Sequence, residues 1–155
     1  METSLLGFTV PDFEAACTGG APFKLSAARG RPLVLYFYPK DNTPGCTLEG
    51  EQFRDLHDEF ARAGARIVGV SRDTLASHER FREKMRFPFE LIADPDERVC
   101  NMFGVIKMKN MYGRQVRGIE RSTFVIDGRG VVRGEWRGVK VPGHAREVLE
   151  FVRSL

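Results

Sequence analysis

The sequence is poor in cysteine and has neither a long apolar run nor a strong excess of one charge. Its three cysteines among 155 residues are too few, and odd in number, for a disulfide scaffold. The longest strongly apolar run, Leu33–Tyr38, is far shorter than the roughly 20 residues of a membrane-spanning helix. The start of the chain, Met1–Ser4, shows no basic segment followed by an apolar stretch, which argues against a signal peptide. We therefore expect a cytoplasmic protein that does not bind membranes.

Glycine and proline are not in excess, at 16 and 8 residues, which excludes collagen-like and low-complexity chains. Hydrophobic residues (42%) and charged residues (29%) occur in the proportions of a globular protein. The length is typical of one domain, residues 1–155. The net charge is only +3, and apolar residues interrupt the densest basic stretch, Lys107–Arg117. We therefore expect no nucleic-acid partner.

Metal-binding patterns are also absent from the sequence. No Cys-x-x-Cys motif occurs, and the three histidines lie far apart, at His57, His78 and His144. No histidine or cysteine pair has the spacing of a zinc site. We therefore expect no structural metal, and attention turns to the cysteines.

The chain alternates strand-like apolar runs with helix-like periodic segments. A short hairpin is indicated over Phe8–Lys24, and two runs that are apolar on both faces predict central strands at Leu33–Tyr38 and Arg66–Ser71. The other expected elements are a helix from Phe53 to Ala63 that ends at Gly64, a helix over Leu75–Met85, a strand at Phe89–Ala93, a short helix around Val99 and Phe103, strands at Ser122–Ile126 and Val131–Trp136, and a helix over Ala145–Val152. This order predicts an α/β fold whose mixed central sheet is covered by helices on both faces, and a thioredoxin-like fold fits it.

The segment from Pro39 to Cys46 stands out chemically. It leaves the C-terminal end of a central strand and enters a helix, with Thr43 as N-cap and Pro44 as first helical residue. Cys46 then lies in the first turn, where unpaired N–H groups and the helix dipole stabilise a thiolate. The Thr43 hydroxyl can donate and accept, so it could hold the thiolate and an attacked oxygen together. We interpret Cys46 as a reactive nucleophile; the alternative is a buried cysteine that acts as a small apolar residue.

Two separated motifs resemble those of the peroxiredoxin family, in the branch called bacterioferritin comigratory protein or Q-type peroxiredoxin. The first is the run Tyr36–Glu49, which contains Pro39-x-x-x-Thr43-x-x-Cys46. The second is Gly118–Asp127, where the family carries its active-site arginine. Lys140–His144 and the closing helix also fit, so the resemblance extends over roughly Leu6 to Leu155.

The resemblance implies a thioredoxin-like fold and a peroxidase for hydrogen peroxide or alkyl hydroperoxides that needs no cofactor. Cys46 would attack the peroxide and become a sulfenic acid. Arg121 would lie beside the thiolate and stabilise charge on the leaving oxygen. Thr43 would hydrogen-bond the thiolate and position the peroxide, and Pro39 would shield the sulfur from water. Glu49 also matches the family pattern, but an exposed helix glutamate explains it equally well, so we do not include it in the site.

The usual resolving cysteine of this branch is missing. Its position five residues after Cys46 holds Glu51, and the alternative position on the next helix holds Arg82 and Glu83. Three mechanisms stay open: direct reduction by an outside thiol such as thioredoxin, resolution by Cys100 after local unfolding, or a thiol from a second chain. We favour the one-cysteine mechanism and a monomer, since members of this branch are often monomeric.

Cys100 is as well explained by a half-buried structural thiol as by a resolving role, and we interpret Cys17, near the N-terminal hairpin tip, as structural. Two rival functions remain. A thiol–disulfide oxidoreductase would need a Cys-x-x-Cys motif, but Thr43 stands three residues before Cys46. The second rival is a non-enzymatic binding or chaperone protein on the same fold, since fold does not determine function. That function would not explain why Pro39, Thr43, Cys46 and Arg121 occur together.

Overall fold

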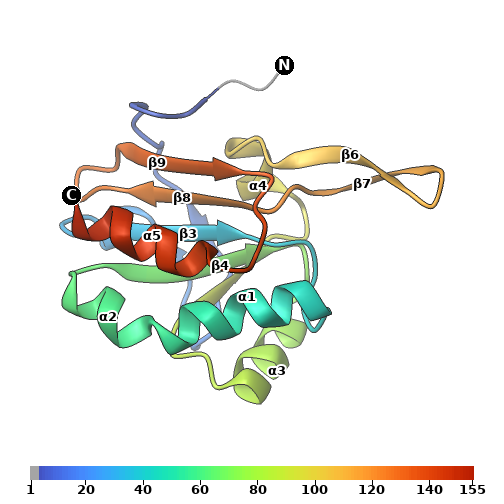
Figure 1. Ribbon diagram of the computed structural model, residues 1–155, viewed down its shortest axis with the longest axis horizontal. Helices are drawn as coiled ribbons and strands as arrows, with labels where there is room; N and C mark the ends of the chain where they lie inside the picture. The colour runs from blue at the N-terminus through green and yellow to red at the C-terminus, as the bar shows by residue number, and fades with distance from the viewer. Residues whose placement is uncertain (1–3) are drawn as a thin grey trace.

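A mixed five-stranded sheet forms the centre of the computed structural model, which describes residues 4–155 (Figure 1). The strand order is β5-β4-β3-β8-β9; β3 pairs parallel with β4 and β4 with β5, whereas β8 pairs antiparallel with β3 and β9. The bounds are β3 Leu33–Phe37, β4 Arg66–Ser71, β5 Glu90–Ala93, β8 Ser122–Ile126 and β9 Val132–Arg137. The expected mixed sheet is confirmed.

The central strand β3 is buried along its whole length and separates two hydrophobic clusters. Leu33, Leu35 and Phe37 belong to one cluster, and Val34 and Tyr36 belong to the other. This alternation follows from the period of two in a strand, which sends successive side chains to opposite faces. Because both faces are covered, the strand reads as a continuous apolar run in the sequence.

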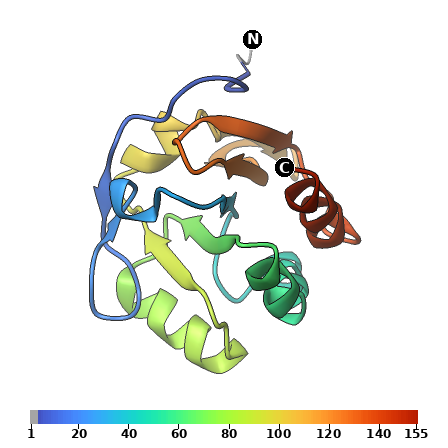
Figure 2. The ribbon, with the colours of Figure 1, turned by 90° about the vertical axis from the view of Figure 1, so that its left-hand side faces the viewer.

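Four helices contribute to the cluster that contains Val34 and Tyr36. They are α1 Pro44–Asp55, α2 His57–Arg62, α3 Leu75–Met85 and α5 His144–Arg153. Figure 2 shows α1, α2 and α5 together on one side of the sheet. The single helix expected from Phe53 to Ala63 is wrong in detail: the chain leaves helical geometry at Leu56, which divides α1 from α2, and α1 begins well before Phe53.

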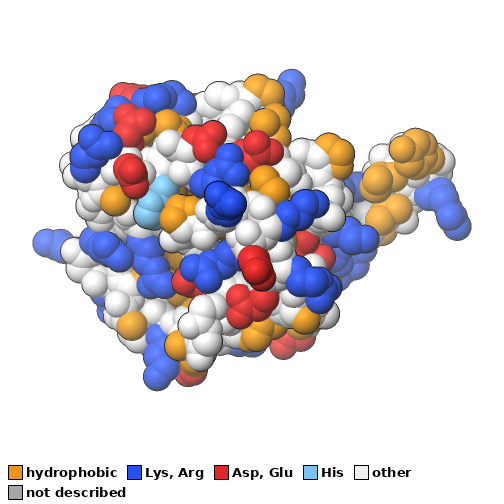
Figure 3. All heavy atoms as spheres, turned by 90° about the horizontal axis from the view of Figure 1, so that it is seen from below, with side chains coloured by type: hydrophobic (Ala, Val, Ile, Leu, Met, Phe, Trp, Pro, Cys, Tyr) orange, Lys and Arg blue, Asp and Glu red, His pale blue; other side chains and the backbone are white. Residues whose placement is uncertain are grey.

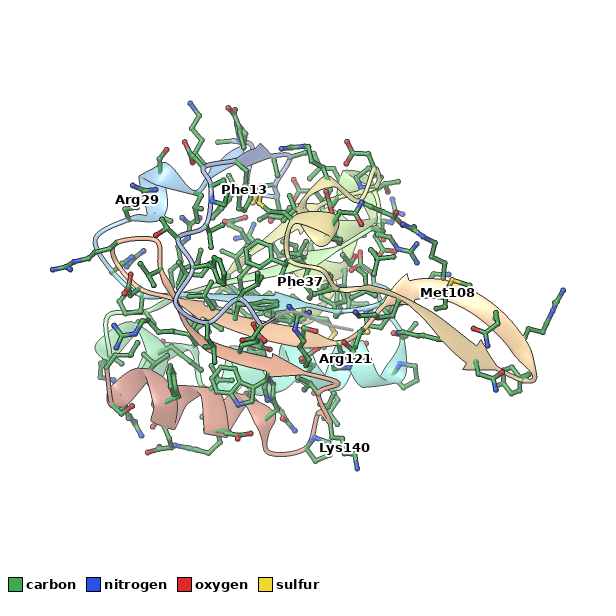
Figure 4. All side chains as sticks on the ribbon, turned by 90° about the horizontal axis from the view of Figure 1, so that it is seen from above. Phe13, Arg29, Phe37, Met108, Arg121 and Lys140 are labelled. Atoms are coloured by element: carbon green, nitrogen blue, oxygen red, sulfur yellow. The ribbon has the colours of Figure 1, made fainter. Side chains whose placement is uncertain are left out.

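The opposite face is covered mainly by the N-terminal part of the chain (Figure 2). The expected N-terminal hairpin is confirmed, since β1 Glu14–Ala15 pairs antiparallel with β2 Phe23–Lys24. The 3-10 helix η1 Ser26–Ala28 follows, and α4 Arg98–Met102 is the helix on this side. Phe13 and Phe37, labelled in Figure 4, both contact the ring of Phe103 at the end of α4, with centroid distances of 6.5 and 5.2 Å.

A two-stranded arm extends from the body (Figure 1). It consists of β6 Ile106–Met111 and β7 Arg114–Ile119, which pair antiparallel and form a sheet of their own. The turn residues Tyr112 and Gly113 both have positive φ, at 53° and 78°, as in a two-residue type I′ turn. Figure 3 shows hydrophobic and basic side chains on the arm. The arm could not be predicted from the sequence, because neither of its strands alternates buried with exposed residues along its length.

Within residues 4–155, no helix has the length and apolar character needed to cross a membrane.

Candidate active site

Cys46 is the third residue of α1, which starts just after the C-terminal end of β3. Thr43 is the N-cap, with an extended backbone, and its carbonyl accepts the N–H of Thr47 at 2.8 Å. Pro44 takes the first position, where the missing N–H costs no hydrogen bond. The Cys46 side chain is 3% exposed. The sequence therefore placed Cys46 correctly in the first turn, at the sheet edge where α/β proteins commonly bind ligands.

Arg121 reaches Cys46 because β8 runs antiparallel to β3. Ser122, the first residue of β8, pairs with Phe37, the last residue of β3, so the chain enters β8 where β3 ends. Arg121 Nη2 donates to Cys46 Sγ at 3.5 Å. Figure 4 shows Arg121 beside α1, with Met108 further out on the arm. The sheet register thus joins two residues that lie far apart in the sequence.

Glu49 completes the charge cluster from the next turn of α1. Arg121 Nη1 donates to Glu49 Oε1 at 2.6 Å, so one guanidinium contacts both the carboxylate and the sulfur. Glu49 is 1% exposed, and burial, opposed by Arg121, raises the pKa of its carboxyl to about 7. Its second oxygen, Oε2, is buried and has no hydrogen-bond partner among the described residues. An exposed helix glutamate is therefore the wrong interpretation of Glu49.

Gly45 makes room for the guanidinium. A Cβ atom at this position would lie 3.2 Å from Arg121 Nη2, which is tighter than an ordinary van der Waals contact. A side chain at the position before Cys46 would therefore require the Arg121 guanidinium to shift by a few tenths of an ångström.

Thr43 and Pro39 are half-buried and flank the same loop. The expected hydrogen bond from Thr43 to the sulfur is not made in this conformation. The single hydroxyl proton of Thr43 goes to the carbonyl of Lys40, at 2.8 Å, because the turn brings that carbonyl within reach. The lone pairs of the hydroxyl are still able to accept a hydrogen bond. Pro39 lies two residues after the end of β3, at the start of the loop that leads into α1.

Cys100 and Cys17 belong to the cluster on the other face of β3, whereas Cys46 belongs to the cluster beneath α1. Cys100 is 0% exposed, so the expected half-buried thiol is in fact completely buried. Burial, and then Asp94, raise the pKa of the Cys100 thiol. Burial, and then the charge of Glu90, raise the pKa of the Cys17 thiol to about 11.

One group of side chains has metal-ligand types, namely Asp41, Asp73 and His78, whose ligand atoms lie within 4.8 Å of one another. The atoms of Asp41 and His78 are 2.6 Å apart, a hydrogen-bond distance, and both carboxylates accept further hydrogen bonds. We interpret this group as a hydrogen-bond network rather than as a metal centre.

The geometry agrees with comparisons with known proteins. Residues 6–135 match the model of the AhpC/TSA family. A protein named Peroxiredoxin Bcp from Xanthomonas campestris is 52% identical over 143 residues, which cover 92% of this chain and 89% of that protein. This chain is a peroxiredoxin of the AhpC/TSA family. Peroxiredoxin Bcp from Bacillus subtilis is 45% identical, over 97% of this chain and 96% of its own. The expected family and branch are confirmed.

Solved structures of peroxiredoxins share the fold. A cysteine-to-serine variant of PrxQ from Xylella fastidiosa matches with a TM-score of 0.94 and 42% identity, covering 99% of this chain and 98% of that one. The bacterioferritin comigratory protein of Xanthomonas campestris, whose trapped intermediate and ligand complexes concern alkyl peroxide reduction, matches with a TM-score of 0.87 and 51% identity, covering 92% and 90%. The expected thioredoxin-like peroxiredoxin fold is confirmed.

Proposed function

We propose that this chain is a thiol-dependent peroxidase that reduces hydrogen peroxide and alkyl hydroperoxides with Cys46. The observation that carries the proposal is the contact of Arg121 Nη2 with Cys46 Sγ, at 3.5 Å, in the first turn of α1. The guanidinium and the helix N-terminus both favour a thiolate, which is the nucleophilic form of cysteine. The membership in the peroxiredoxin family supports the same activity.

In the first step the Cys46 thiolate attacks one oxygen of the peroxide. A sulfur–oxygen bond forms, the oxygen–oxygen bond breaks, and the electron pair leaves with the distal oxygen as hydroxide or alkoxide. The sulfur is oxidised by two electrons to a sulfenic acid, and the leaving oxygen takes up a proton to become water or an alcohol. Arg121 stabilises the negative charge that moves from the sulfur to the leaving oxygen.

Thr43 and Pro39 shape the peroxide pocket in this proposal. Since the Thr43 hydroxyl donates to Lys40, its lone pairs can accept the O–H of a bound peroxide. Pro39 has no N–H and an all-carbon side chain, so in this proposal it lowers the access of water to the sulfur. Thr43 therefore acts on substrate orientation and Pro39 on the exclusion of water, and neither takes part in the electron transfer.

In the second step an outside thiol, such as that of thioredoxin, attacks the sulfenic sulfur. A mixed disulfide forms and water leaves; a second thiol then releases the Cys46 thiol and carries away the disulfide. This one-cysteine mechanism is supported by the burial of Cys100 in the other cluster and by Glu51, Arg82 and Glu83 at the positions where relatives carry a resolving cysteine. We also propose that the protein is a monomer, as the resemblance suggests, and that it is cytoplasmic.

The deciding experiment adds one equivalent of hydrogen peroxide to the reduced protein and measures the intact mass without reductant. A gain of about 16 Da that a sulfenic-acid trap captures at Cys46 supports the one-cysteine peroxidase. A loss of about 2 Da would indicate an intramolecular disulfide, and peptide mapping would show whether it joins Cys46 to Cys100. A doubled, reducible mass would indicate a second chain. No rapid change at all would contradict the peroxidase itself.

A further inference from the structure

The loop that leads into α1 is fastened to α3 through the buried carboxylate of Asp41. Asp41 is 6% exposed, and its oxygens accept three side-chain hydrogen bonds. Tyr38 donates to Oδ1 at 2.6 Å, Ser77 donates to Oδ2 at 2.8 Å, and His78 Nδ1 lies 2.6 Å from Oδ2. Asp41 therefore joins the end of β3 to the first turn of α3.

His78 is completely buried and bonded at both ring nitrogens. Nδ1 faces the Asp41 carboxylate, and Nε2 lies 2.9 Å from the carbonyl oxygen of Ile92 in β5. A carbonyl oxygen can only accept, so Nε2 donates to Ile92, and the bond between Nδ1 and Asp41 Oδ2 holds one shared proton. A buried pair of this kind is geometrically strict, because either partner alone would be left as a buried polar group without its hydrogen bond.

The same loop is held from two further directions. The N–H of Asp41 donates to Asp73 Oδ2 at 2.9 Å, and the Ser71 hydroxyl also donates to that oxygen. Lys84 of α3 donates to the side chain of Asn42 at 2.7 Å, where the backbone has a positive φ of 62°. The loop conformation thus depends on partners outside it, from the end of β4 and from α3.

We infer that the Asp41–His78 pair is a positioning pair for the peroxidase reaction, which holds the start of α1 so that Cys46 stays beside Arg121. The inference rests on the proposed function. Arg121 directly precedes β8 and lies outside this loop, whereas Cys46 lies in the first turn of α1, which follows the loop. Loss of the pair lets the loop sample other conformations, and the rate with peroxide falls in proportion to the fraction of chains in which Cys46 and Arg121 meet. Neither residue touches the reacting atoms.

The test compares His78→Gln with a matched control, His144→Gln. His144 is also buried and starts a helix, but it bonds to Thr123 in the sheet and not to the loop. Glutamine at position 78 can donate to only one of the two acceptors and carries no charge. We expect the second-order rate constant for hydrogen peroxide to fall by about tenfold to a hundredfold in His78→Gln, as for a small displacement of reacting groups, and by less than about twofold in the control.

Two further readouts separate positioning from general destabilisation. In His78→Gln, amide hydrogen exchange should accelerate across residues 40–48 before it does so in β3 and β8. In Asp41→Asn, the new amide can donate to a neutral His78 ring, so the bond is restored without charge and the rate should recover to within about fivefold of the unaltered protein.

Equal rates for His78→Gln and the unaltered protein would overturn the inference, as would equal losses in His78→Gln and His144→Gln. If His78→Gln does not fold, Ser77→Ala decides, because it removes a single bond to Asp41: a rate lowered by about twofold supports the inference and an unchanged rate overturns it. If the unaltered protein consumes no peroxide, the proposed function fails on its own. The hydrogen exchange of residues 40–48 in His78→Gln then still reports whether the pair holds the loop.

Discussion

Two cysteines of this protein occupy the same position in their helices and have opposite surroundings. Cys46 is the third residue of α1 and Cys100 is the third residue of α4, and both are buried. Beside Cys46 lies the guanidinium of Arg121. At the start of α4, Asp94 instead accepts the N–H of Val99 at 3.0 Å and of Cys100 at 2.7 Å.

The difference teaches that a helix N-terminus does not by itself make a reactive cysteine. In α4 the carboxylate of Asp94 occupies the N–H groups that could stabilise a thiolate, and its negative charge opposes a second one. Burial and this carboxylate together raise the pKa of the Cys100 thiol. In α1 the guanidinium of Arg121 contacts the sulfur instead, and a positive charge of this kind favours the ionised form of a thiol. In the proposed mechanism, this difference in neighbouring charge separates the nucleophile, Cys46, from an inert thiol, Cys100.

The largest expected effect separates the two cysteines directly. Cys46→Ser should abolish peroxide consumption because no thiolate is left to attack, whereas Cys100→Ser should keep the rate of the unaltered protein. Cys100→Ser should lose about 1 kcal/mol of unfolding free energy, the low end of the cost of burying a hydroxyl, since Asp94 can accept its hydrogen bond. Peroxide consumption with a thiol reductant and denaturant unfolding measure both. A folded Cys46→Ser that still turns over peroxide, or an inactive Cys100→Ser, would break the comparison.

The next largest effect removes the positive charge at Cys46. Arg121→Ala should lower the second-order rate constant with hydrogen peroxide by about a hundredfold to a thousandfold, as for other lost transition-state donors. Arg133→Ala is the control, because Arg133 is half-exposed and pairs with Asp127 away from the site. Stopped-flow measurement of both variants tests the prediction. An unchanged rate in Arg121→Ala would show that the helix alone activates Cys46.

A smaller effect concerns the carboxylate that holds Arg121. Glu49→Gln keeps a hydrogen-bond acceptor but removes a charge, and should cost roughly 1 kcal/mol of transition-state stabilisation, or about fivefold in rate. Rates of the variant and the unaltered protein at pH 8, where Glu49 is ionised, test this. Equal rates would mean that Arg121 keeps its place without Glu49.

The same substitution changes how stability depends on pH. The folded pKa of Glu49, about 7, lies above its ordinary value of 4.5, so the folded chain retains a proton that the unfolded chain releases. The contribution of Glu49 to stability is present below pH 4.5 and is lost as the pH rises through 7. His144 acts oppositely: burial lowers its pKa from 6.5 to about 4, so its contribution is present above pH 6.5 and is lost as the pH falls.

Glu49→Gln should therefore gain stability relative to the unaltered protein as the pH rises from 4.5 to 7, because only the unaltered protein loses the Glu49 contribution. Urea unfolding of both proteins at several pH values measures the difference. A difference that is constant over this range would contradict the raised pKa of Glu49.

The smallest effect tests the space beside the sulfur. Gly45→Ala should lower the rate with peroxide by about threefold, because the new Cβ pushes the Arg121 guanidinium away from Cys46. The stability of the folded protein should not fall, since alanine is the better helix former. Rate constants and thermal unfolding of the same sample test both parts. A rate equal to that of the unaltered protein would show that Arg121 tolerates the displacement.

Local patterns predicted most of the fold. The apolar runs gave β3 and β4, the periodic run Leu75–Met85 matches α3, and the N-cap and proline at Thr43 and Pro44 put Cys46 in a first helical turn. The sequence did not predict the break at Leu56, because the apolar helical period continues across it. It did not predict the β6–β7 arm either, because the arm strands have no regular apolar period.

The site divides in the same way. The sequence predicted that Cys46 is special, and only the family resemblance drew attention to Arg121 among the many arginines of the chain. The sequence left Glu49 ambiguous and gave no sign that Asp41 and His78 form a buried pair. Contacts between residues distant in the sequence depend on strand pairing and helix packing. Local periodicity does not predict either, so these contacts could not be predicted.

By itself, the sequence determined the elements, their order and the place of a cysteine at the start of a helix, since propensity, capping and period are properties of neighbouring residues. Only the tertiary structure decided which charged side chain lies beside the cysteine in the first turn of α1 and of α4. The antiparallel register of β8 on β3 brings Arg121 to Cys46, and the loop after β5 turns Asp94 toward Cys100. The chemistry of a thiol depends on charges a few ångströms away, and folding, not spacing in the chain, sets those distances.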